Sequence, residues 1–432
     1  MAGPSNWQFQ QQIMEQFLAL QQQEIDDINM IEQGIADLEE NEPSRVSRRT
    51  FINRDRVKAH NELVKKYFAV DCIYPQRMFR RRFRMRRELF HRIRADIEVV
   101  EPYFQLKYDC TGRAGFTSIQ KITAALRILA YGNPIDREDE ALSIAETTAT
   151  ETVRIFCRTI IDMYSEQYLR SPNERDLIRL IDENKSRGFP GMIGSLDCMH
   201  WEWKNCPTAW HGQYVGHYGR PTMVLEAVAS QDLWIWHSFF GMPGSYNDIS
   251  VLDHSPLFDR FIQCQTPNIP YEVNGRMYHI PYYLTDCIYP HYATLVQTLK
   301  HPKNEMEKHF AKKQEAARKD VKRAFGVLQS KWAITQGPVR FWDEETVTNI
   351  MNCCIILHNM IIEDERHLNI EPWQPVLGEV MPSDLLEHDE GLLGCFISSR
   401  MQQVRDRSVN GRLRNDLMIH LWNNFGGETA HM

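Results

Sequence analysis

Three aspartates lie within predicted β-strands or just after them. Asp197 lies within a strand predicted for residues 192–203, Asp248 follows a third strand, and Asp286 directly follows a fourth. Aspartates at strand ends of a mixed sheet can converge on one edge, where a divalent cation neutralises their repulsion. Two Mg²⁺ or Mn²⁺ ions there would activate a water or a 3′-hydroxyl in phosphodiester chemistry. A turn or helix cap is the commoner role for Asp248 alone, but Asp197 and Asp286 favour the metal site.

A second set of potential metal ligands consists of Cys198, His200, Cys206 and His211. Cys198 and His200 point to the same side of a strand, but the spacing of the four residues matches no zinc pattern. Core thiols and a hydrogen-bonded histidine are the better interpretation. The ten cysteines of the chain contain no CxxC motif, which is typical of reduced intracellular thiols.

The charge of the chain is distributed unevenly. The 432 residues include 57 acidic and 50 basic side chains, a net charge of −7. Residues 77–94 hold nine arginines and one acid, Glu88, so this segment carries +8 and the remainder carries −15. Such a segment could neutralise several DNA phosphates. The alternative is a solvated helix face paired with acids elsewhere, but nine arginines are hard to pair locally, which favours DNA contact. The predicted contacts are Arg80, Arg81, Arg82, Arg84, Arg86 and Arg87.

Helical patterns precede the strands. Apolar residues from Phe83 to Ile97 recur at helical intervals, so one side of the arginine-rich segment can pack while the arginines project from the other. Thr117 or Ser118 is predicted to cap a helix that ends at Gly132. Ser171, followed by Pro172 and Glu174, predicts a capping box that opens another helix.

A helix-turn-helix is compatible with residues 138–160. The pattern comprises a short helix at 138–144, a threonine-rich turn at Thr147 and Thr148, and a helix through Val153 and Ile160. Two short helices and a turn occur in any all-α domain, so this pattern alone gives weak support for DNA binding.

The order of elements after Pro190 predicts an α/β fold. Strands are predicted at 192–203, 222–229 and 233–240, the last broken by residues 241–245. A helix from Asp248, a fourth strand at 282–285 and a long helix at about 309–332 follow. Three strands, a helix, a strand and a helix is the order of a ribonuclease H-like core.

The composition excludes several classes of protein. Hydrophobic residues make up 43% of the chain, which excludes a wholly disordered or collagen-like protein. No apolar run is long enough to cross a bilayer, and no secretory signal is visible at the N-terminus. We expect four regions: a glutamine-rich tail (1–52), an α-helical domain (53–188), a ribonuclease H-like nuclease domain (189–365) and a C-terminal loop and helix (366–432). The apolar residues of the tail, from Ile28 to Leu38, favour either a partner-binding helix or a frayed polar helix.

The sequence closely resembles PIF/Harbinger transposases, specifically the plant Pong-like branch. The blocks that carry the resemblance are residues 79–85, 118–126, 194–203, 225–230, 232–236, 243–248, 283–290, 317–321, 323–330 and 355–361. Blocks this long and in this order make chance a poor explanation. The resemblance implies a DDE nuclease of ribonuclease H-like fold that cuts transposon ends and joins them to target DNA, with Mg²⁺ or Mn²⁺ as cofactor. It also implies a nuclear location and a Myb/SANT-like partner that supplies much of the DNA recognition. Cutting two ends makes a homodimer plausible.

The resemblance assigns roles to individual residues. Asp197 and Asp286 match the two catalytic aspartates, and Asp248 matches a further metal-ligating aspartate. The family motif A-R-K-D-V-E-R-A-F-G reads Ala317-Arg-Lys-Asp-Val-Lys322-Arg-Ala-Phe-Gly326 here, so Lys322 replaces the catalytic glutamate. Lys322 lies 36 positions after Asp286, in agreement with the family interval. An ammonium cannot bind Mg²⁺ and would repel it.

No neighbouring acid is expected to replace that glutamate. Asp320 lies about 200° around the helix from Lys322, and Glu315 lies roughly 10 Å along its axis. We hypothesise that Lys322 is a built-in counter-cation for the aspartates, so the pocket needs no metal. Arg318, one turn earlier, would point into the same pocket and either hold a DNA phosphate or pair with Glu315 or an aspartate. The protein is then either a transposase with an impaired nuclease or an inactive descendant that acts through binding.

Overall fold

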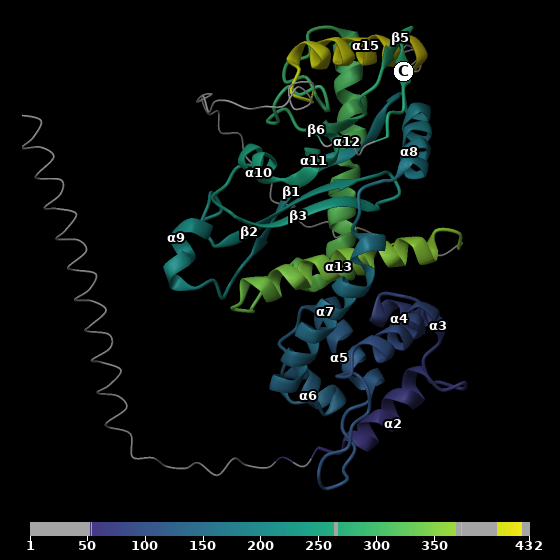
Figure 1. Cartoon of the computed structure of the whole chain (residues 1–432), viewed down its shortest axis with the longest axis vertical. Coiled ribbons are helices and arrows are strands. Elements are labelled where there is room, and N and C mark those ends of the chain that lie inside the picture. The colour runs from purple at the N-terminus through teal and green to yellow at the C-terminus, as the bar shows by residue number, and fades with distance from the viewer. Residues whose placement is uncertain (1–51, 53, 263–266, 369–372, 374–403, 426–432) are drawn as a thin grey trace, which may run out of the picture. The chain divides into compact units, whose positions relative to one another are not determined.

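A computed structural model describes residue 52 and residues 54–262, 267–368, 373 and 404–425. The glutamine-rich tail and the proline-bearing loop after residue 373 lie outside the described residues. The described residues from Arg54 onward form one compact unit. Within it a mixed sheet is flanked by helices, which confirms the α/β class (Figure 1).

The central sheet has five strands in the order β3-β2-β1-β6-β7. These are β1 (Met192–Glu202), β2 (Thr222–Ala229), β3 (Ile235–Pro243), β6 (Tyr282–Thr285) and β7 (Leu295–Gln297). Strands β1, β2 and β3 pair antiparallel, whereas β6 pairs parallel to β1 and β7 parallel to β6. The predicted strands at 222–229 and 282–285 are therefore confirmed to the residue.

The two faces of β1 are covered by different helices, because successive side chains of a strand point to opposite faces. Leu196 lies in a cluster with α8 (Glu174–Ser186), and Cys198 contacts Val251 of α10 (Asp248–His254). Met199 and Trp201 share the largest hydrophobic core with α12 (Glu305–Lys331) and α13 (Glu344–Glu365). Asp197 is two residues before Met199 in the strand, so its side chain lies on the same face as Met199 and its carboxylate points toward α12.

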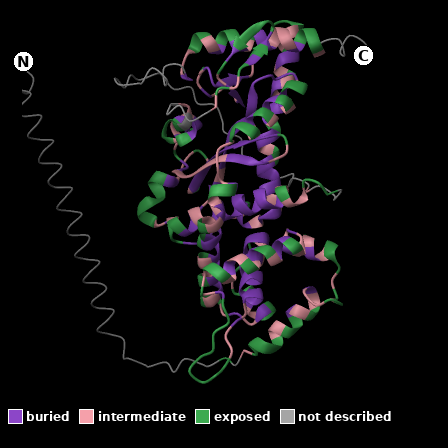
Figure 2. Ribbon diagram, turned by 45° about the vertical axis from the view of Figure 1, so that its right-hand side comes forward, coloured by how far each residue is buried: buried purple, intermediate pink, exposed green. Residues whose placement is uncertain are grey.

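The helices before the sheet share this largest core. They are α2 (Arg56–Tyr67), α3 (Gln76–Phe83), α4 (Arg87–Val100), α5 (Ser118–Tyr131), α6 (Arg137–Leu142) and α7 (Glu146–Tyr168). Helix α13 packs against α7 on one side and β3 on the other, and buried positions occur on both the helices and the sheet (Figure 2). The remaining elements are α9 (His211–Tyr214), α11 (Asp259–Ile262), the hairpin β4 (Tyr271–Val273) and β5 (Arg276–Tyr278), and α15 (Arg407–Phe425), which packs on α12.

Two predicted helix boundaries are correct and two are wrong. Thr117 caps α5 through a capping box with Gln120, and Gly132 ends it in the left-handed conformation. Asn173, not Ser171, caps α8, because its side chain accepts the N–H of Asp176. Thr147 and Thr148 lie inside the first turn of α7 rather than in a turn before it. Helix α7 then packs on α5 and α13, and nine of its 23 residues are buried, so one face of the helix belongs to the core.

Two further expectations are corrected by backbone geometry. Arg84 takes a left-handed conformation (φ 65°), which divides the arginine-rich segment into α3 and α4 instead of one helix. Strand β3 continues to Pro243 instead of breaking at Gly241, because Gly241 (φ 116°) lies where the pairing with β2 shifts register. A bulge with glycine at positive φ bends a strand without ending it.

Candidate functional site

Asp197 and Asp286 lie level with each other at one edge of the sheet. Ser195 of β1 is in register with Leu284 of β6. Asp197 lies two residues after Ser195, and Asp286 lies two residues after Leu284. Because these strands are parallel, both carboxylates point the same way from the same height on the sheet. The structure therefore brings together two of the three predicted aspartates.

Helix α12 is anchored beside these carboxylates by polar contacts to the sheet. The Ser195 hydroxyl donates to the carbonyl of Ala317 at 3.0 Å. The Gln314 amide donates to the carbonyls of Thr285 and Val296 at 3.0 and 3.1 Å. These buried bonds fix the rotation of α12, so the residues one turn further along it face the site.

Two cations of α12 point at the aspartates. Arg318 Nη1 lies 3.4 Å from Asp197 Oδ2 and 3.6 Å from Asp286 Oδ2, while its Nη2 donates to Glu315 at 3.0 Å. Lys322 Nζ lies 3.3 Å from Asp197 Oδ2. Arg318 therefore pairs with both Glu315 and the aspartates, and Lys322 stands beside Asp197.

Burial and charge oppose each other at this cluster. Asp197 is 2% exposed, and its other oxygen accepts the backbone N–H of Cys198 at 3.0 Å. Burial raises the pKa of Asp197, although the charges of Lys322 and Arg318 act to lower it. Burial lowers the pKa of Arg318, but the hydrogen bond to Glu315 and the charges of the aspartates outweigh this and raise it overall. The two cations thus partly offset the effect of burial on the Asp197 carboxylate.

Asp248 begins α10, on the face of the sheet that bears Cys198. It is 2% exposed, and its charge adds to burial in raising the pKa of the Cys198 thiol. Among the residues that the structure describes, no group of three or more His, Cys, Asp or Glu side chains is placed to hold a metal ion.

Sequence reasoning missed one buried acid on the face of the sheet that bears Cys198. Glu226 of β2 lies opposite Cys198, is fully buried, and is 3.2 Å from His237 Nε2. Its signal in the sequence was a single glutamate within the otherwise apolar run 222–229.

The residues of the alternative zinc set and the possible replacement acids have other partners. Cys198 Sγ lies 3.4 Å from the Tyr289 hydroxyl, and His200 Nδ1 lies 3.1 Å from Thr222 Oγ1. Burial lowers the pKa of His200 to about 4. Asp320 pairs with Arg187 and Arg323, at 2.7 Å in each case.

The arginine-rich segment is largely engaged inside the fold. Arg80 forms a two-pronged pair with Glu365 (2.6 and 2.8 Å), and Arg86 does so with Asp364 (2.7 and 2.5 Å). Both acids lie in the last turn of α13, where the helix dipole disfavours negative charge, so the arginines offset an unfavourable placement.

The other predicted contacts fall into two groups. Arg82 stacks on the Tyr74 ring at 4.1 Å, Arg84 donates to the carbonyl of Ala130, and Arg87 donates to Cys72 Sγ. Arg81, by contrast, is exposed. The structure therefore separates this arginine from five partly buried ones: Arg80, Arg82, Arg84, Arg86 and Arg87.

Similarity to other proteins was found at the level of sequence. Residues 166–369 match a family described as plant transposon protein, and residues 60–98 match a domain of unknown function. The chain is 25% identical to an ALP1-like protein of Arabidopsis thaliana over 259 residues, which are 58% of this chain and 63% of that protein. It therefore spans less than two thirds of the length of that relative.

A second relative is the candidate nuclease HARBI1 of Bos taurus. It is 25% identical over 280 residues, which are 63% of this chain and 75% of that protein. No solved structure matches the chain. In the described residues no helix is long and apolar enough to cross a membrane.

Proposed function

We propose that the chain is a PIF/Harbinger-derived transposase-like protein, a DDE-type nuclease whose cutting is blocked by Lys322. Its remaining function is to bind DNA and partner proteins. The sheet order β3-β2-β1-β6-β7, with three antiparallel strands followed by two parallel ones, supports a ribonuclease H-like core. The register that aligns Asp197 with Asp286 supports descent from a two-carboxylate nuclease site.

The observation that carries the proposal is the ammonium of Lys322, 3.3 Å from Asp197. Together with Arg318, it supplies two positive charges to the site where Mg²⁺ or Mn²⁺ would be needed. A divalent cation does not fit this arrangement, because two fixed cations repel it and already neutralise Asp197 and Asp286. The missing third carboxylate removes a ligand as well.

One feature favours a second candidate, an impaired but active nuclease. The Lys322 side chain is 33% exposed, so solvent would stabilise its ammonium if the side chain turned away from Asp197. Asp197, Asp286 and Asp248 would then be the residues available to a metal ion.

Strand cleavage distinguishes the two candidates. Labelled element ends are incubated with the full chain and Mn²⁺, and we expect no cleavage by the native protein or by Asp197→Asn. Lys322→Glu restores the third carboxylate and is expected to cut. Cleavage by the native chain that disappears in Asp197→Asn would contradict the blocked-nuclease proposal. Thermal melts of each variant show whether it is folded.

DNA binding is proposed to rest on Arg81, the exposed member of the six predicted arginine contacts. We expect Arg81→Gln to weaken DNA binding and to reduce the slope of log affinity against log salt by about one, since one phosphate contact is lost. Arg86→Gln is the matched variant, because it leaves Asp364 partly buried and without its two-pronged partner. It is expected to lower the melting temperature and leave the slope nearly unchanged. Equal slopes for native protein and Arg81→Gln would exclude this contact.

The partners and location remain part of the proposal. We propose that a Myb/SANT-like protein supplies sequence-specific DNA recognition, that the protein acts in the nucleus, and that it forms a homodimer when two DNA ends are held. Arg318, predicted as a possible phosphate contact, is assigned instead to Asp197, Asp286 and Glu315.

A further inference from the structure

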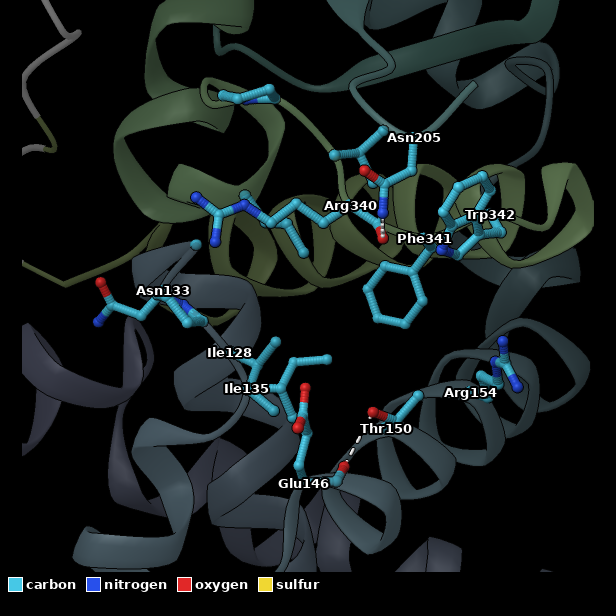
Figure 3. Close-up of a pocket in the computed structure, with 15 residues that line it drawn as sticks. Ile128, Asn133, Ile135, Glu146, Thr150, Arg154, Asn205, Arg340, Phe341 and Trp342 are labelled. Carbon is cyan, nitrogen blue, oxygen red and sulfur yellow. Dashed lines mark hydrogen bonds between the residues drawn. The ribbon is translucent and has the colours of Figure 1, made fainter. Parts of the chain in front are cut away.

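A cavity of about 400 Å³ is lined by none of the aspartates and lies between helices and loop segments. Its walls come from the C-terminal end of α5, the N-terminal end of α7 and residues 334–342 (Figure 3). Most of the lining is apolar: Ile128, Pro134, Ile135, Ile334, Val339 and Phe341. This volume is typical of pockets that accept a small ligand or a protruding side chain.

One carboxylate points into this apolar cavity. Figure 3 shows the Glu146 side chain directed toward the space below the Phe341 ring, whereas the guanidinium groups of Arg154 and Arg340 lie at opposite ends. The Thr150 hydroxyl donates to the Glu146 carbonyl at 2.9 Å within the same helical turn. In the part of the chain that the structure describes, the Glu146 carboxylate makes no ion pair. An apolar pocket with one inward carboxylate is complementary to a cation on an aliphatic stem.

The aromatic side of the cavity is held in place by two residues that follow β1. Trp203 Nε1 donates to the Phe341 carbonyl at 2.8 Å, and Asn205 Nδ2 donates to the Arg340 carbonyl at 2.6 Å. Trp342 follows at the rim and is 65% exposed. An exposed tryptophan at a rim that also bears two arginines has the composition of a protein-binding hot spot.

We propose that this cavity binds a lysine or arginine side chain of a partner protein. The aliphatic stem lies along Ile128 and Ile135, and the cationic head pairs with Glu146 beneath Phe341. Arg154 and Arg340, at the two ends, suit acidic residues that flank the basic one in the partner. The exposed Trp342 offers contact area to a polypeptide. A free polyamine would leave this area unused.

Nucleic acid does not suit the same site, since Glu146 would repel a phosphate from its interior. The exposed Asp343 and Glu345 at the start of α13 add negative charge next to Trp342. The inference stands apart from the nuclease question: Asn205 lies eight residues beyond Asp197 in the chain, and no residue of the aspartate cluster lines the cavity.

The test uses the full chain and fluorescent nonapeptides, acetyl-Ser-Gly-Asp-Gly-X-Gly-Asp-Gly-Ser, with X as Lys, Arg, Gln or Glu. Fluorescence anisotropy is expected to show the Lys or Arg peptide binding at least about tenfold tighter than the Gln peptide. Glu146→Gln is expected to abolish this preference, and Trp342→Ala to weaken binding of the basic peptides. Glu140→Gln, an exposed acid of α6 outside the cavity, should behave as the native chain.

Four outcomes would overturn the inference. They are no binding of any peptide at about 1 mM, a preference for the Glu peptide, a Lys or Arg preference that persists in Glu146→Gln, and spermidine binding tighter than both basic peptides. Glu146 is exposed, so its substitution does not disturb the core, and unchanged melting temperatures confirm that the variants are folded.

Discussion

Lys322→Glu is expected to turn the aspartate cluster into a site that Mn²⁺ stabilises. The substitution removes the ammonium that lies 3.3 Å from Asp197 and puts a third carboxylate at the same place on α12. Without metal, three carboxylates then share Arg318 as their nearest cation, and their repulsion lowers the melting temperature below that of the native chain. Added Mn²⁺ relieves this repulsion, whereas the native site already contains its own counter-charges.

The measurement is a thermal melt of each protein with and without millimolar Mn²⁺ or Mg²⁺. A metal ion at 100 times its dissociation constant stabilises the folded state by about 2.7 kcal/mol, which raises the melting temperature by several degrees. We expect such a rise for Lys322→Glu and no rise for the native protein. An equal rise in both would show that Lys322 does not exclude metal.

Two control variants isolate the cause. Lys319→Glu makes the same change of charge on the exposed side of the same helix, so it should give no metal-dependent rise. Lys322→Gln removes the ammonium without adding a ligand, and is expected to give a smaller rise than Lys322→Glu. If the glutamine variant responds fully, the loss of repulsion alone accounts for metal binding and the third carboxylate is dispensable.

The pairing of Asp197 with Asp286 could be predicted from the sequence, because residues at matching heights of two paired parallel strands lie side by side. The position of Asp248 could not. It follows a strand in the sequence as Asp286 does, but α10 packs on the opposite face of β1, with Val251 against Cys198. Which face a short helix covers depends on tertiary packing, and a local pattern does not contain that information.

The arginine-rich segment shows the same limit for electrostatics. Only Glu88 lies within it, so the sequence indicated unpaired positive charge. The acids that pair with Arg80 and Arg86 are Glu365 and Asp364, almost 300 residues later. A long-range ion pair leaves no periodic signature near either partner.

The hairpin of β4 and β5 could have been predicted from the sequence. Its turn contains Asn274-Gly275, a dipeptide that is a strong turn signal and that the prediction overlooked.

The second large effect is expected from Arg318→Met, which removes the cation shared by the cluster. Arg318 is 7% exposed and lies within 4 Å of carboxylate oxygens of Asp197, Asp286 and Glu315. Methionine keeps most of the volume of the side chain but none of its charge. Breaking a buried ion pair by removing one partner costs about 3–5 kcal/mol, so we expect a loss of this order in the free energy of unfolding at pH 7. Lys319→Met, on the exposed side of α12, should cost far less.

The loss of unfolding free energy in Arg318→Met should be larger at neutral pH than at acidic pH, because it depends on the charge of the carboxylates. Burial already raises the pKa of Asp197 in the folded chain, and without Arg318 the pKa rises further. A carboxyl group with a raised folded-state pKa binds its proton more tightly in the folded state than in the unfolded state. The stability it contributes is therefore present at low pH and is lost as pH rises through that pKa. Urea unfolding should show the deficit of Arg318→Met shrinking between pH 7 and pH 4. A deficit independent of pH would mean that Arg318 stabilises α12 by packing alone, and that Lys322 suffices to hold Asp197 in its charged form.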